Sequence, residues 1–116
     1  MNQNTIAYHY VAWNAAPGQV SIGSYTGNGV DNRAITTPGF SPEWTVVRRA
    51  TNGNNPCDRA AHRTSDLVGD NTLNFANAAT FADGIQALQA TGFQVGTNCQ
   101  VNTNASTYYF AAFNDF

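Results

Sequence analysis

The chain has 116 residues, which is the size of one domain with a single hydrophobic core. Charged residues make up only 10% of the chain, the formal net charge is -2, and lysine is absent. The arginines are scattered and form no basic stripe, so nucleic acid is not expected as a partner. No apolar run approaches the roughly 18 residues that span a bilayer, so no membrane span is expected either.

An aromatic segment at the start of the chain recurs at its end. Residues 4–14, NTIAYHYVAWN, match residues 104–114, NASTYYFAAFN, almost in register. The offset is even, so the strand period of two places matching residues on matching faces. We therefore predict that either segment can fill the same kind of position in a sheet.

Clusters of Gly, Asn and Pro divide the rest of the chain into strand-sized pieces, as is typical of an all-β domain. In chain order, the pieces rich in β-branched and aromatic residues are 19–25, 44–50, 60–64, 72–75 and 93–95. In the first piece, Val20 and Ile22 alternate with Ser21 and Gly23, which favours a half-buried strand. Residues 44–47 are apolar enough for a strand covered on both faces.

Residues 78–90 are ambiguous, because their apolar residues also fit one face of a helix. Gly84 disfavours a long helix, since an interior glycine costs about 1 kcal/mol relative to alanine. We expect a turn, then a strand at 85–89, and a hairpin turn at Thr91 and Gly92. The predicted fold is an all-β, jelly-roll-like antiparallel sandwich, with residues 15–116 as the body and residues 1–14 as a donor strand.

Cys57 and Cys99 are the only cysteines. An even count in a chain that resembles exported proteins favours a disulfide, which would contribute about 3 to 4 kcal/mol. Two unpaired buried thiols remain the alternative, because sequence does not fix the distance between the two residues.

Several short runs resemble extracellular and phage-tail-associated β-sandwich repeats. These runs are GFSPEWTVVRR, AHRTSDLVGD, ALQATGFQVGTN and the aromatic terminal strand, and together they cover roughly residues 18–116. In such repeats the terminal strand runs directly into the next unit, and here that junction corresponds to residues 12–29. The chain thus resembles a repeat that begins one strand early, and the resemblance implies an adhesive or structural surface protein without catalytic residues.

Two polar clusters have residue types found at sites of chemistry. His62, Ser65 and Asp66 suggest a hydrolase, but no nucleophile motif surrounds the serine. Asp66, Asp70 and Asn71 suggest calcium, but their spacing does not match a calcium loop. The two histidines and two cysteines also lack zinc-site spacing. We therefore expect no enzyme activity, no cofactor and no metal.

A coat of Asn, Thr, Gln, Ser and Gly lacks the charges, lysine above all, that keep sheet edges apart. Copies of the chain are therefore the expected partner, in an extracellular or cell-surface filament assembled head-to-tail by strand donation. The expected donor residues are Ile6, Tyr8, His9, Tyr10, Val11, Ala12 and Trp13. The expected acceptor or terminal-strand residues are Tyr108, Tyr109, Phe110 and Phe113.

A carbohydrate-binding adhesion module is the alternative function, with glycans as the partner. The aromatic residues that would stack on a sugar are Trp13, Tyr25, Trp44, Tyr108 and Tyr109. The sequence also leaves open whether residues 4–14 fold back onto their own sandwich beside residues 104–114.

Overall fold

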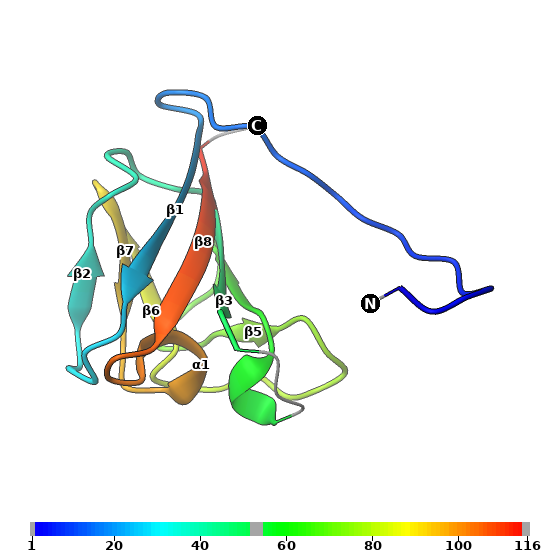
Figure 1. Ribbon diagram of the computed structural model, residues 1–116. Helices are drawn as coiled ribbons and strands as arrows, with labels where there is room; N and C mark the ends of the chain where they lie inside the picture. The colour runs from blue at the N-terminus through cyan, green and yellow to red at the C-terminus, as the bar shows by residue number, and fades with distance from the viewer. Residues whose placement is uncertain (1, 52–54, 115–116) are drawn as a thin grey trace.

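A computed structural model describes residues 2–51 and 55–114, which form two antiparallel sheets packed face to face (Figure 1). The first sheet has five strands in the order β1 (Val20–Thr26), β8 (Thr107–Phe113), β3 (Trp44–Arg49), β4 (Ala61–Thr64) and β5 (Leu73–Asn74). The second sheet has three strands in the order β2 (Arg33–Ile35), β7 (Gly92–Val95) and β6 (Ile85–Gln89). The predicted all-β sandwich is confirmed.

The hydrophobic core lies between the sheets and draws on both of them. From the five-stranded sheet, β8 contributes three alternate residues that point inward and are buried, Tyr108, Phe110 and Ala112. Phe93 on β7 packs edge-on against Phe110, with ring centroids 5.4 Å apart. Tyr25 of β1 stacks on Tyr108 at 5.4 Å. The aromatic terminal strand is therefore an interior strand whose inward side chains meet the facing sheet.

The ambiguous segment 78–90 forms no helix. The chain bends at residues 82–84 and enters β6, which pairs with β7 through a turn at Ala90 and Thr91. Gly84 is buried, and a Cβ atom at this position would clash with the side chain of Thr72. Glycine is therefore required for close packing there. The predicted strand and hairpin are confirmed, with the turn one residue earlier than expected, since Gly92 already belongs to β7.

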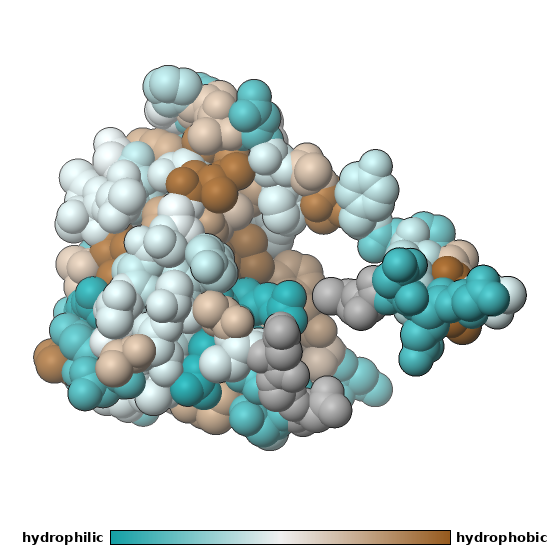
Figure 2. All heavy atoms as spheres, viewed as in Figure 1, coloured by the Kyte–Doolittle hydropathy of each residue, from teal (hydrophilic) through white to brown (hydrophobic). Residues whose placement is uncertain are grey.

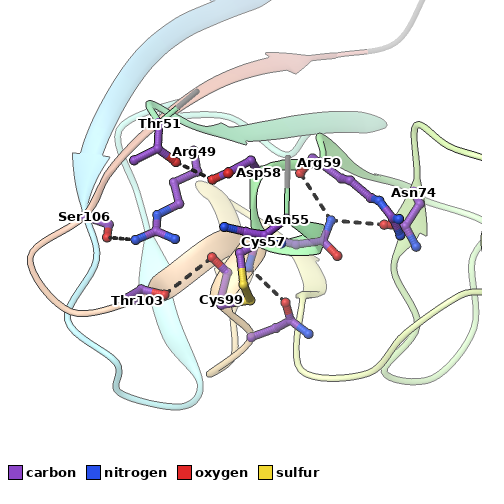
Figure 3. The surroundings of a disulfide bond; sticks show 12 residues. Arg49, Thr51, Asn55, Cys57, Asp58, Arg59, Asn74, Cys99, Thr103 and Ser106 are labelled. Atoms are coloured by element: carbon purple, nitrogen blue, oxygen red, sulfur yellow. Dashed lines mark hydrogen bonds between the residues drawn. A yellow bond between two sulfur atoms is a disulfide. The ribbon is translucent and has the colours of Figure 1, made fainter. Parts of the chain in front are cut away.

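Three short elements were not predicted: β2, the 3-10 helix η1 (Pro56–Asp58) and the helix α1 (Cys99–Asn102). Each helix is capped by an asparagine, because the side chain of Asn55 accepts from the Cys57 N–H and that of Asn98 accepts from the Gln100 N–H. A disulfide joins Cys57 on η1 to Cys99 on α1, with 5.1 Å between their Cα atoms (Figure 3). The predicted disulfide is confirmed.

One buried arginine organises the loop after β4. Arg63 points inward, is only 6% exposed, and donates hydrogen bonds to four backbone carbonyls. The carbonyls belong to Leu67, Gly69, Asn71 and Ile85. Charged donors make stronger hydrogen bonds than neutral ones, so this guanidinium fixes the loop to the sheet edge.

Of two expectations about strand faces, one is confirmed and one is corrected. β1 is half-buried as predicted, and Ile22 points outward while Gly23 and Tyr25 face the core. The reason is the Phe110 ring: a Cβ atom at Gly23 would lie 2.9 Å from it, so only glycine fits on the inner side. Trp44 and its β3 neighbours are also not covered on both faces, because the residues of β3 that point outward are only partly buried or exposed.

Candidate assembly surface

The N-terminal segment, defined as residues 2–15, lies outside the sandwich and extends away from it (Figure 1). Among the described residues its backbone hydrogen bonds are local, from the Ile6 N–H to the Gln3 carbonyl and from the Gln3 N–H to the Tyr8 hydroxyl. The predicted strand is therefore not formed within this chain. The segment joins β1 through a tight turn in which Ala16 and Val20 exchange backbone hydrogen bonds.

The N-terminal segment exposes the apolar side chains that were expected on a donor strand. Tyr10 is 93% exposed and Val11 is 67% exposed, while Ile6, Tyr8, His9 and Ala12 are exposed as well. The segment contains no Asp, Glu, Lys or Arg. Scattered apolar residues are ordinary on a protein surface, but this uncharged segment brings several of them together.

A second apolar surface lies on the five-stranded sheet, on the side that faces away from the core. We call it the outer face, and it consists of Val20, Ile22 and Ser24 on β1, Tyr109, Ala111 and Phe113 on β8, Trp44, Val46 and Arg48 on β3, His62 and Thr64 on β4, Leu73 on β5, and Phe75. Figure 2 shows hydrophobic residues on the body beside β1 and β8, and the N-terminal segment standing apart from the body. Neither sheet of the sandwich covers this face.

Trp13 connects the N-terminal segment to the outer face. Its ring packs edge-on against Phe113, with centroids 5.2 Å apart, and against Trp44 at 6.2 Å. Trp44 in turn stacks on Phe113 at 5.0 Å. Phe113 is thereby buried although it points away from the core. The contact anchors the base of the segment and leaves residues 2–12 free of the sandwich.

His62 extends the aromatic cluster on the outer face. Its ring lies 4.4 Å from that of Phe75, and its Nδ1 accepts a hydrogen bond of 3.2 Å from Trp44 Nε1. Burial lowers the pKa of His62. Because Nδ1 is an acceptor, the neutral imidazole is the form that fits this cluster.

The expected acceptor residues all lie on β8, which pairs with β1 along one edge and with β3 along the other. Both of its backbone edges are thus used, so β8 itself has no room for an added strand. Tyr108 and Phe110 face the core, whereas Tyr109 is 59% exposed on the outer face. A strand from another copy would have to add at a sheet edge, and β1 is one such edge.

The other candidate residues lie apart from one another. Ser65 donates to the Glu43 carboxylate rather than to His62. Asn71 donates to the Val68 carbonyl, as turn-forming side chains commonly do. Asp70 instead accepts from the N–H of Asp83, which lies 13 residues away in the sequence. In the described ranges no three His, Cys, Asp or Glu side chains cluster closely enough to hold a metal ion.

Tyr25 cannot belong to a surface platform for sugars. Its hydroxyl donates to the Val101 carbonyl at 2.7 Å, and burial raises its pKa far above the usual value. Trp44 is on the outer face instead, next to Phe75, with ring centroids 6.3 Å apart. Sequence reasoning did not identify Ile22, Phe75 and His62 as surface residues. For Ile22 the alternation along β1 points to the wrong face, because the apolar residues of a half-buried strand are expected to face the core.

The chain belongs to the family described as Domain of unknown function (DUF7483), whose model matches residues 1–115. The match includes the N-terminal segment as well as the sandwich. No curated protein and no solved structure matches the chain. In the part of the chain that the structure describes, no helix is long and apolar enough to cross a membrane.

Proposed function

We propose that this DUF7483 domain is a structural subunit that assembles head-to-tail, each copy docking its N-terminal segment on the sandwich of the next. The observation that carries the proposal is the state of this segment. It repeats the sequence of the interior strand β8, yet it makes no strand pairing with its own sheets among the described residues. A strand-like segment that lacks a partner within its chain is open to pairing with a sheet edge of another chain.

Strand addition suits such a segment. Backbone hydrogen bonds supply an affinity that depends little on sequence, and alternating side chains fix register and direction. The segment and its docking surface lie on different parts of the molecule, so the contact is heterologous. A heterologous contact that does not close into a ring produces an open filament.

The proposed setting is extracellular. The disulfide between Cys57 and Cys99 is typical of oxidising compartments, where such bonds form and persist. A chain without lysine and with few charges also lacks the usual protection of soluble domains against association at sheet edges. Both features fit a filament subunit outside the cell.

Deletion of residues 2–13 tests the proposal. The sandwich should remain folded, because the deleted residues contribute no strand to either sheet. Assembly, measured by sedimentation velocity and electron microscopy, should be lost. A matched control deletes only the polar residues 2–5 and should assemble like the full chain. Filaments formed by the longer deletion would refute the proposal, as would a full-length chain that remains monomeric at high concentration.

Glycan binding is the second candidate, and one observation favours it. Trp44 and Phe75 stand side by side on the outer face, and Phe75 is 54% exposed, as a stacking platform for a sugar requires. A glycan array probed with the monomeric deletion variant would separate the two functions. Specific binding that Phe75→Ala abolishes would support the glycan function.

A further inference from the structure

The outer edge of β1 is occupied at its two ends. At one end, Val20 donates to the Ala16 carbonyl at 2.8 Å and accepts from the Ala16 N–H at 2.9 Å. At the other end, the Thr26 carbonyl accepts from the Arg33 guanidinium at 2.6 Å. Both Val20 and Thr26 therefore direct backbone groups away from β8, toward the free side of the sheet.

Between these ends lies a short open stretch. Backbone groups along a strand alternate in direction, so Ile22 and Ser24 point the same way as Val20 and Thr26. Their N–H and C=O groups find no partner among the described residues, which leaves four hydrogen-bonding groups unpaired. No charged residue occurs in β1 (Val20–Thr26), so nothing on this strand repels an incoming strand.

We propose that this stretch of β1 is the docking site for the N-terminal segment of a second copy, which pairs there antiparallel with Val11 opposite Ile22 and His9 opposite Ser24. The proposal rests on the proposed function and names the surface that receives the segment. Its basis is the repeat: residues 7–13 correspond to residues 107–113, and those form the strand that β1 already pairs with on its other side.

The register follows from the pairing of β1 with β8. Ile22 lies opposite Ala111, and Ser24 lies opposite Tyr109, the residues that match Val11 and His9. Ala111 lies on the outer face. Its N–H and C=O groups point away from β1, because the same groups of its register partner Ile22 point away from β8. A segment with the orientation of β8, placed on the far side of β1, directs the same groups of Val11 toward Ile22. Backbone pairing and side-chain face therefore agree in this register.

Docking in this register extends the outer face by one strand. Val11 would cover Ile22, which is 47% exposed, on the apolar side of the sheet. Tyr10 would lie on the opposite side, beside Gly23, where the Phe110 ring already occupies the space over the glycine. Residues 9–11 carry the backbone contacts, since Ala16 and Arg33 close the two ends of the open stretch.

Disulfide trapping between two variants tests the site. Val11→Cys mixed with Ile22→Cys should form an intermolecular bond under mild oxidation, because opposed Cα atoms in such a pair lie about 5.5 Å apart, within disulfide range. Ala12→Cys mixed with Ile22→Cys is the matched control, with the new cysteine on the other face. We expect about 10-fold less cross-link in the control, since a one-residue shift turns the side chain to the opposite face.

A third mixture separates edge addition from strand exchange. If the segment instead replaced β8 in the second copy, Val11 would lie opposite both Ile22 and Val46, as Ala111 does. Val11→Cys mixed with Val46→Cys should therefore give no cross-link, and a strong one would overturn the edge site in favour of exchange. If Ile22→Cys gives no cross-link although deletion of residues 2–13 abolishes assembly, the docking site is wrong and the proposed function stands. If that deletion leaves assembly intact, both are wrong.

Discussion

A negative charge at Val11 should prevent assembly without affecting the fold. Val11 is 67% exposed and Ile22 is 47% exposed in the isolated chain, so docking would remove apolar surface from both. Full burial of one such side chain contributes about 1.5 to 3 kcal/mol, and a carboxylate at an apolar contact adds a desolvation cost. Val11→Asp should therefore weaken association by about 3 kcal/mol, which is roughly 100-fold in the dissociation constant.

Stability should not change, because Val11 lies outside the hydrophobic core and surface substitutions of this kind usually alter the free energy of unfolding by no more than about 0.5 kcal/mol. Sedimentation velocity over a range of concentrations measures the association, and urea unfolding measures the stability. Asn4→Asp is the matched control, since it adds the same charge outside the proposed contact. The reasoning is refuted if Val11→Asp associates like the wild type, or if Asn4→Asp weakens association equally.

Three further predictions concern the sandwich itself. Replacing Cys57 and Cys99 by alanine should lower the free energy of unfolding by about 4 kcal/mol, because the disulfide closes a loop with a sequence separation of 42. Urea unfolding measures this loss, and a loss below about 1 kcal/mol would contradict the account. Arg63→Met should lower the free energy of unfolding by about 4 kcal/mol, since four carbonyls lose their donor at about 1 kcal/mol each. Arg48→Met, on the exposed face, is the control and should have little effect. Burial lowers the pKa of His62 from 6.5, so its contribution to stability is complete above pH 6.5 and declines as the pH falls below that value. His62→Gln should reduce the change in melting temperature between pH 7.5 and pH 5 relative to the wild type. His9→Gln should leave that change as it is in the wild type.

The hairpin and the sandwich were predictable because local signals agree with the final structure. Gly84 and the turn before β7 exclude a long helix, and strand-sized pieces between turn residues indicate two antiparallel sheets. β2 was not predictable in the same way. It has three residues, Arg33–Ile35, and its strand character depends on pairing with β7 far along the chain.

The faces of β1 show a second limit of sequence reasoning. Hydrophobicity alone predicts that Ile22 faces the core. The ring of Phe110 instead occupies the space beneath Gly23, so the face of β1 that carries Gly23 points inward and Ile22 points outward. Likewise, residues 4–14 and 104–114 carry nearly the same pattern, yet only the second copy forms a strand, because only it has neighbours on both sides. A strand pattern identifies a segment that can pair, and the tertiary structure decides whether a partner is present.

Amide hydrogen exchange of residues 7–13, resolved by NMR at low and high protein concentration, tests the central claim most directly. At high concentration the amides of His9 and Val11 should be protected, whereas those of Tyr8 and Tyr10 should exchange rapidly, because only alternate residues of an added edge strand face β1. On dilution all four should exchange rapidly. Rapid exchange at every concentration, or equal protection in the dilute monomer, would contradict the claim that this segment docks on another copy.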